Sequence, residues 1–125
     1  MKRIVIVDDH PAFCEHWKAL FEDRYPNLAA VEVFTDPLQA LSVLSPDIGL
    51  LMLDLEMPVM DGKKVLEFAV ARGVARTRVV ISSGRHADHL HELFPAGDCL
   101  AVINKDEPAQ QAAFLMILDS VMRRP

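Results

Sequence analysis

The chain has 125 residues and is 51% hydrophobic, which fits one globular domain over residues 1–125 and excludes an intrinsically disordered chain. Its net charge of −5 argues against a domain whose main work is to coat nucleic-acid phosphates. No apolar run approaches the length of a membrane span or of a signal peptide. Cys14 and Cys99 lack metal-site spacing and are typical of reduced thiols. Taken together, these features lead us to expect a cytoplasmic protein that binds neither nucleic acid nor membrane.

Short apolar runs alternate with helical patterns along the whole chain. The predicted strands, in chain order, span residues 3–7, 31–34, 48–53, 78–81 and 100–103. The predicted helices run from Pro11 to the residue before Tyr25, from Pro37 to before Ser45, from Gly62 to before Gly73, roughly over 87–94, and from Pro108 onward. Asp36 stands where an N-cap is expected, and Gly73 suits the left-handed position after a helix.

Five strand–helix units in succession predict an α/β fold with a parallel sheet covered by helices on both faces. Because crossovers between parallel strands are right-handed, few topologies remain. We expect the flavodoxin-like, doubly wound (βα)5 arrangement with strand order 2-1-3-4-5. In the third helix, the predicted inward residues are Val65, Leu66 and Ala69. In the last helix they are Ala113, Phe114, Ile117, Leu118 and Val121.

The apolar run over residues 50–53 ends abruptly in Asp54, and Pro58 follows soon after. Such a run is typical of a strand buried on both faces, and the proline cannot continue a central strand. Asp54 is therefore predicted to lie at the carboxyl end of a central strand, where open parallel sheets carry their chemistry. The other strands with reactive ends lead into Asp8 and Asp9, into Ser82 and Ser83, and into Lys105.

In the strand order 2-1-3-4-5 these strand ends converge in one shallow cleft. Three carboxylates repel one another unless a cation lies among them, and hard oxygen ligands suit Mg²⁺. With Mg²⁺ in place, a phosphoryl group can approach Asp54, Lys105 can neutralise charge on its oxygens, and a serine hydroxyl can donate to one of them. The set predicts one reaction, in which Asp54 attacks phosphorus and becomes an aspartyl phosphate.

Together these residues resemble the receiver domain of two-component response regulators over essentially the whole chain. The resemblance rests on Ile6-Val7-Asp8-Asp9, on residues 53–58 with Asp61-Gly62 after them, on Ser82 and on Lys105. It implies that Asp54 is the phospho-acceptor and that Ser82 and Lys105 contact the phosphoryl group. It also implies a Mg²⁺ site made by Asp9, Asp54 and the backbone carbonyl of Glu56, with Asp8 acting through water.

The resemblance implies a switch domain rather than an enzyme, with only self-catalysed phosphoryl transfer and autodephosphorylation. A sensor histidine kinase or a phosphotransfer protein would donate the phosphoryl group. An output domain or a second copy of the chain would bind the face formed by the fourth helix, the fifth strand and the last helix. The segments 7–11 and 104–108 further resemble receivers fused to helix-turn-helix domains in transcription regulators.

The region after the fourth strand departs from the family pattern. Val102 stands three residues before Lys105, where the family usually has an aromatic residue, so rotation of a ring between two states is not expected. For the switch hydroxyl, the spacing from Asp54 favours Ser82, whereas the spacing back from Lys105 favours Ser83. We choose Ser82 and keep Ser83 as the alternative.

Two other functions are weighed against this one. A phosphatase of the haloacid dehalogenase type also uses an aspartate nucleophile with Mg²⁺ and a second acid two residues later, which is the offset of Glu56 from Asp54. In that family, however, the nucleophile lies on the first strand. The second alternative is a degenerate receiver that serves only as a protein-binding scaffold, although no member of the acceptor set is missing. Glu56 itself is predicted to be a solvent-facing loop residue.

Overall fold

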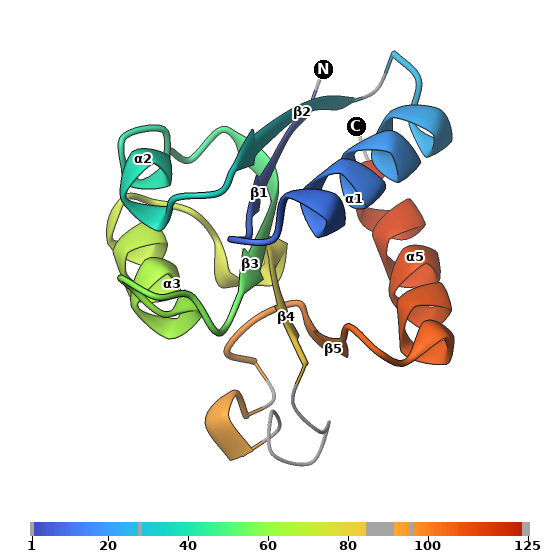
Figure 1. The fold of residues 1–125 in the computed structure, drawn as a ribbon. Helices are drawn as coiled ribbons and strands as arrows, with labels where there is room; N and C mark the ends of the chain where they lie inside the picture. The colour runs from blue at the N-terminus through green and yellow to red at the C-terminus, as the bar shows by residue number, and fades with distance from the viewer. Residues whose placement is uncertain (1, 28, 85–91, 96, 124–125) are drawn as a thin grey trace.

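The computed structural model describes residues 2–27, 29–84, 92–95 and 97–123, and it places five parallel strands in one sheet (Figure 1). The strands are β1 (Lys2–Val7), β2 (Ala29–Phe34), β3 (Ile48–Asp54), β4 (Val79–Ser83) and β5 (Ala101–Asn104). Their order in the sheet is β2-β1-β3-β4-β5. The predicted α/β, flavodoxin-like fold with strand order 2-1-3-4-5 is confirmed.

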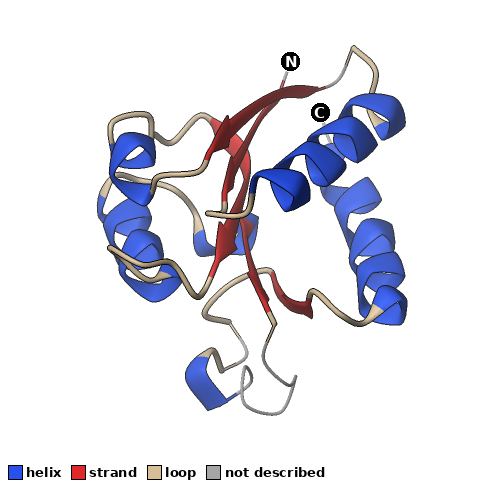
Figure 2. Ribbon diagram, in the orientation of Figure 1, coloured by secondary structure: helices blue, strands red, loops and turns tan. Residues whose placement is uncertain are grey.

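Helices cover both faces of this sheet. They are α1 (Pro11–Arg24), α2 (Pro37–Leu41), α3 (Gly62–Ala71) and α5 (Pro108–Met122), with a short 3₁₀ turn, η1, at Arg76–Arg78. α2 and α3 lie on one side of the sheet, and α1 and α5 lie on the other (Figure 2). The helix predicted over residues 87–94 falls largely outside the described residues. Among the described residues, no helix is both long enough and apolar enough to cross a bilayer.

Each face of the sheet buries its own apolar cluster, because side chains alternate along a strand. Val5, Val7, Leu51 and Leu53 belong to the cluster beneath α2 and α3. Ile4, Ile6, Leu50 and Met52 belong to the cluster beneath α1 and α5. All residues of β3 are buried, as predicted for a central strand. Asp8 and Asp54 continue the alternation of this second set of side chains, two residues after Ile6 and Met52. Both acids therefore begin on the side of the sheet that faces α1 and α5.

The predicted caps hold, and the helix boundary that differs most from the prediction is the end of α2. Asp36 Oδ1 accepts a hydrogen bond from Leu38 N–H at 2.9 Å, which satisfies a donor in the first turn of α2. Gly73, after α3, has a φ of 95°, the left-handed conformation that favours glycine. α2 is shorter than predicted. Val43 N–H donates to Ala40 O, three residues earlier, at 3.0 Å, so the chain forms a tight turn there in place of a further α-helical turn. Leu38 is left 49% exposed.

The inner face of α5 differs from the prediction. Phe114, Leu118 and Met122 are buried, whereas Ile117 is 46% exposed and Ala113 is also exposed. The prediction is therefore wrong at Ala113 and Ile117, and it missed Met122. α5 is apolar on most of its sides, so periodicity alone does not decide which stripe is buried. The buried face is the one that carries Phe114, whose ring contacts the Trp17 ring on α1 with the two centroids 5.8 Å apart.

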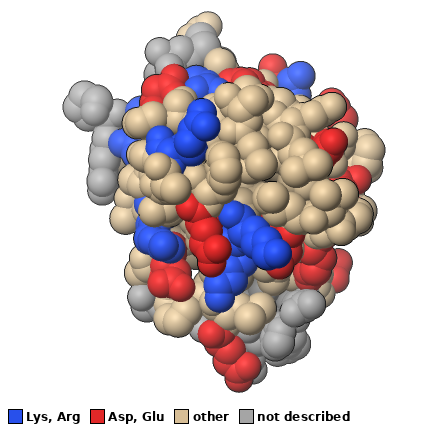
Figure 3. Space-filling view, turned by 90° about the vertical axis from the view of Figure 1, so that its left-hand side faces the viewer, with Lys and Arg blue, Asp and Glu red and all other residues tan. Residues whose placement is uncertain are grey.

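The face over α2 and α3 carries charges of both signs. Figure 3 shows Lys and Arg side chains beside Asp and Glu side chains, with uncharged surface around them. Domains that bind nucleic acid usually gather positive charge on one face, and the face in this view does not have that character.

Candidate functional site

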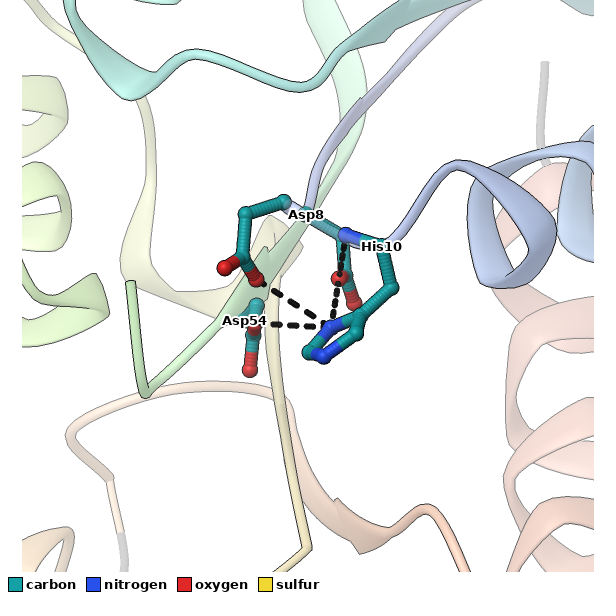
Figure 4. A group of neighbouring side chains, drawn as sticks. Asp8, His10 and Asp54 are labelled. Carbon is teal, nitrogen blue, oxygen red and sulfur yellow. Dashed lines mark hydrogen bonds and ion pairs between the residues drawn. The ribbon is translucent and has the colours of Figure 1, made fainter. Parts of the chain in front are cut away.

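Three aspartates meet at the carboxyl end of the sheet. Asp8 and Asp9 follow β1, Asp54 ends β3, and these two strands are neighbours. One ligand atom from each of Asp8, Asp9, Asp54 and His10 lies within 4.8 Å of the other three. Figure 4 shows Asp8 and Asp54 facing the His10 ring. The structure thus brings together the three acids that the strand ends predicted.

The two central carboxylates are cut off from water. Asp8 and Asp54 are each 1% exposed. Burial raises the pKa of Asp54 to about 7, the charge of Asp8 adds to this effect, and Lys105 opposes it. Asp54 Oδ1 accepts a hydrogen bond from Glu56 N–H at 3.3 Å, whereas Asp54 Oδ2 accepts none from the described residues. Burial and Asp8 thus favour the protonated form of Asp54, and positive charge close by favours the ionised form.

Lys105, which follows β5, brings an ammonium group to these acids. Its Nζ lies 2.7 Å from Asp8 Oδ2 and 3.4 Å from Asp54 Oδ1, and its side chain is 15% exposed. The Phe13 ring supports it from α1, with the ring centroid 4.3 Å from Nζ, within cation–π range. Lys105 N–H donates to Ser83 O at 2.8 Å, which extends the pairing of β4 and β5. The predicted lysine thus lies within reach of a group bound to Asp54.

Both candidate hydroxyls lie within β4, so they point to opposite faces of the sheet. Ser82 is the register partner of Asp54 and therefore begins on the same face. Its buried Oγ donates to Leu53 O at 3.3 Å. Ser83 Oγ instead donates to the Glu56 carboxylate. The geometry favours Ser82 as the hydroxyl beside Asp54 and gives Ser83 a different partner.

Glu56 is not the solvent-facing residue that the sequence predicted. It is only partly exposed, because its carboxylate turns toward β4 and accepts the hydrogen bond from Ser83. The loop is held to the sheet by Leu55 N–H, which donates to a carbonyl of β4 at 2.9 Å. It closes where Gly62 N–H donates to Leu55 O at 2.9 Å, and a Cβ at Gly62 would collide with Asp54 O. These contacts keep the Glu56 backbone next to Asp54.

His10 is the member of the cluster that the sequence analysis did not single out. Its Nδ1 lies 2.9 Å from Asp8 Oδ1, 3.1 Å from Asp9 Oδ1 and 3.7 Å from Asp54 Oδ2. His10 is the N-cap residue of α1, directly before Pro11, so its place follows from where that helix begins. The available signal was a metal-binding residue type directly after two acids.

Comparison with known proteins identifies the family. The sequence profile of the response regulator receiver domain matches residues 4–120. The chain belongs to this family. Membership sets aside the phosphatase alternative and places this receiver domain in two-component signalling. A comparison with curated proteins finds no match.

Solved receiver structures share the fold of this receiver domain. The Vibrio cholerae chemotaxis protein CheY4 has a TM-score of 0.76 at 17% identity, covering 93% of this chain and 97% of that chain. The BeF3-activated N-terminal receiver domain of Klebsiella pneumoniae RstA has a TM-score of 0.76 at 23% identity, covering 98% of this chain and 100% of that one. The Thermotoga maritima response regulator TrrA, in complex with Mg²⁺-BeF, has a TM-score of 0.74 at 19% identity, covering 97% and 99%. At these identities the likeness shows the fold.

Receiver domains typically bind Mg²⁺ at an acidic cluster, and the residues of this receiver domain fit such an ion. Asp9 Oδ1 and Asp54 Oδ2 are buried oxygens that accept no hydrogen bond from the described residues. Burying a charged oxygen without a partner is costly, and a bound cation removes that cost. Carboxylate oxygens are also the hard ligands that Mg²⁺ prefers.

A hollow of about 680 Å³ opens beside the cluster. Its wall includes Asp9, His10, Glu56, Lys63 and Phe94. Two of these residues, Asp9 and His10, also contribute to the acidic cluster. The hollow therefore borders the acidic cluster on the side of the loop that follows β3.

Val102 occupies the position where receiver domains usually have an aromatic residue. It lies in β5, opposite Ile81 of β4, and it is partly buried. It packs against the apolar cluster beneath α2 and α3, on the other side of the sheet from the row that leads to Asp54. A valine side chain is short, and its χ1 angle is restricted.

Proposed function

We propose that this receiver domain is a switch that accepts a phosphoryl group on Asp54 from a sensor histidine kinase or a phosphotransfer protein. The observation that carries the proposal is the setting of Asp54. It is a buried carboxylate, one of its oxygens accepts no hydrogen bond from the described residues, and an ammonium group lies 3.4 Å from the other. A carboxylate in this setting is a nucleophile with a counter-charge already in place.

In the proposed step, an oxygen of Asp54 attacks the phosphorus of a phosphohistidine. An O–P bond forms, the N–P bond of the donor breaks, and the donor imidazole leaves with the electron pair and takes up a proton from solvent. Asp54 must be ionised to attack, and burial together with the charge of Asp8 raises its pKa and so opposes this. Lys105 favours the ionised form and also counters the charge on the transferred group.

We further propose that Asp9, Asp54 and the backbone carbonyl of Glu56 hold Mg²⁺, with Asp8 acting through water. When bound, Mg²⁺ supplies positive charge that stabilises the phosphoryl oxygens during transfer. The loop that carries Glu56 supports this role, because Leu55 N–H ties it to β4 directly beside Asp54. A carbonyl on a fixed loop needs little ordering to act as a ligand.

The response to phosphorylation would start at Ser82 and Lys105. Ser82 Oγ donates to Leu53 O and can donate to a phosphoryl oxygen on Asp54 instead. The Lys105 ammonium is shared between Asp8 and Asp54, and a dianionic group on Asp54 draws it away from Asp8. The Lys105 backbone N–H is hydrogen-bonded to a carbonyl of β4. We propose that this hydrogen bond, rather than an aromatic ring at position 102, transmits the movement of Lys105 into β5.

The surface that reads the change would be the face of β5 and α5, extended by the segment before β5. Met116 and Ile117 lie on α5 and are 74% and 46% exposed. Exposed apolar side chains of this kind suit the docking of an output domain or of a second copy of the chain. Exchange with a histidine kinase would require a cytoplasmic domain, and we propose that location.

Incubation with acetyl phosphate and Mg²⁺, followed by measurement of the intact mass, tests the proposal. The wild type is expected to gain the mass of one phosphoryl group, and Asp54→Asn is expected to gain none. Failure of the wild type to gain this mass would favour the degenerate receiver that acts only as a scaffold. A gain in Asp54→Asn would show that another residue is the acceptor.

A further inference from the structure

The His10 ring faces Asp8 and Asp54 (Figure 4), and Asp9 belongs to the same cluster. Its Nδ1 faces one oxygen from each acid, at 2.9 Å from Asp8, 3.1 Å from Asp9 and 3.7 Å from Asp54.

The spacing of these atoms matches that of ligands around one metal ion. With metal–ligand distances of about 2.1 Å in an octahedral site, adjacent donors lie about 3 Å apart and opposite donors about 4.2 Å apart. Two of the distances from His10 Nδ1 are 2.9 and 3.1 Å, the third is 3.7 Å, and all four donor atoms lie within 4.8 Å of one another. The 2.9 Å contact with Asp8 is also a hydrogen bond, and Lys105 Nζ lies 3.5 Å from the same nitrogen. A cation that enters the cluster would replace these two contacts and take Nδ1 as a fourth ligand beside the three oxygens.

The backbone holds His10 in this position. His10 is the N-cap of α1, Pro11 begins the helix, and His10 N–H donates to Asp8 Oδ1 at 2.9 Å. The side chain is 65% exposed, so the ring can adjust to an ion that enters from solvent. A buried oxygen, Asp54 Oδ2, accepts no hydrogen bond from the described residues and faces the same ring.

We propose that His10 is a metal ligand and that the site prefers borderline divalent ions, such as Mn²⁺, Co²⁺ or Zn²⁺, to Mg²⁺. Imidazole nitrogen suits these transition ions, whereas Mg²⁺ selects oxygen donors. The inference rests on the metal site of the proposed function and adds a nitrogen ligand and a metal preference to it. Phosphorylation of Asp54 with Mg²⁺ does not depend on it.

Electron spin-echo measurements on the Mn²⁺-loaded protein test this directly, since a coordinated imidazole gives a ¹⁴N modulation that oxygen ligands do not give. We expect that modulation in the wild type and in His16→Asn, whose exposed histidine lies on α1 outside the cluster, and not in His10→Asn. Titrations that follow the free Mn²⁺ signal should show affinity falling ~10-fold or more in His10→Asn. Competition of Mg²⁺ with bound Mn²⁺ should show that His10→Asn loses much less affinity for Mg²⁺ than for Mn²⁺.

Each other outcome counts against a separate statement. Bound Mn²⁺ without ¹⁴N modulation in the wild type, or with modulation that survives in His10→Asn, overturns the role of His10. In that case His10 is a counter-ion that leaves as the metal enters, and His10→Asn should bind Mg²⁺ more tightly than the wild type. Absence of any bound Mn²⁺ would contradict the metal site of the proposed function itself. The phosphorylation of Asp54 is read independently by the mass measurement with Mg²⁺.

Discussion

The ammonium of Lys105 lies 3.4 Å from Asp54 Oδ1, although the two residues end strands that are separated in the sheet by β4. Both side chains are largely buried, so solvent and salt screen the pair less than they screen a pair on the surface. Lys105 therefore acts on Asp54 directly in this structure. It lowers the pKa of Asp54 against the opposing effects of burial and of Asp8.

Replacing Lys105 with methionine should raise the pKa of Asp54 further in the metal-free protein, by ~1 unit, because the opposing positive charge is lost. The measurement is the pH dependence of the Asp54 carboxyl ¹³C shift. Lys64→Met, a change at an exposed lysine on α3, is the matched control and should leave the titration unchanged. An Asp54 titration that does not move in Lys105→Met would contradict the pairing.

The two serines of β4 should have separable effects. Ser82→Ala should still accept a phosphoryl group on Asp54 but should lose most of the resulting amide shift at Lys105, because the hydroxyl on the Asp54 side of the sheet is gone. Ser83→Ala should keep that shift and change the environment of Glu56, its hydrogen-bond partner. Amide ¹H–¹⁵N spectra with and without acetyl phosphate and Mg²⁺ distinguish the two. The reverse pattern would make Ser83 the switch hydroxyl.

The Asp119 carboxylate on α5 accepts hydrogen bonds from residues at the end of α1. Arg24 donates two, at 2.9 and 2.7 Å, and Tyr25 Oη donates one at 2.6 Å. These donors lower the pKa of Asp119 to about 2, with Arg24 the larger cause. A carboxyl whose pKa is lower in the folded state stabilises the fold above its ordinary pKa, near 4, and loses this contribution as pH falls toward 2.

We therefore expect Asp119→Asn to lower the free energy of unfolding at neutral pH by less than about 1 kcal/mol, since the pair is partly exposed. The difference from the wild type should shrink as the pH falls through about 4 to about 2. Urea denaturation at several pH values measures it. Asp23→Asn, an exposed acid on α1, is the control for the change in net charge. A difference that grows in acid would contradict the assignment.

The observed inner face of α5 can be tested by a pair of adjacent residues. Leu118 is fully buried and Ile117 is 46% exposed. Leu118→Ala should lower the free energy of unfolding by about 2–5 kcal/mol, because it leaves a cavity in the core. Ile117→Ala should change it by no more than ~0.5–1 kcal/mol. Similar losses for the two variants in urea denaturation would show that the helix presents a different face to the sheet.

The strand ends could be predicted from sequence because they follow from local patterns. Asp54 ends an apolar run, and the alternation of strands and helices gives the strand order that brings Asp8, Asp9 and Lys105 beside it. What stayed ambiguous was the choice between adjacent serines. The sequence spacings conflict, and only the register of β3 with β4 shows that Ser82 shares a face with Asp54.

Contacts between distant segments account for what the sequence could not show. Glu56 looked like a loop residue open to solvent, and its carboxylate turns inward because Ser83 on β4 supplies a donor. His10 looked like part of a helix start, and it lies among the acids because β1 and β3 end side by side. On α5, an almost uniformly apolar helix offers several faces. The predicted face was right at Phe114 and Leu118 but wrong at Ile117, which is exposed.

The most direct test of the central claim is to locate the phosphoryl group among the three clustered aspartates. Borohydride reduces an aspartyl phosphate to homoserine, so treatment of the acetyl phosphate-reacted, Mg²⁺-loaded protein marks the acceptor for peptide mass sequencing. We predict homoserine at position 54 and unchanged aspartate at Asp8 and Asp9. Homoserine at Asp8 or Asp9, or at no position in protein that carries the added mass, would contradict Asp54 as the acceptor.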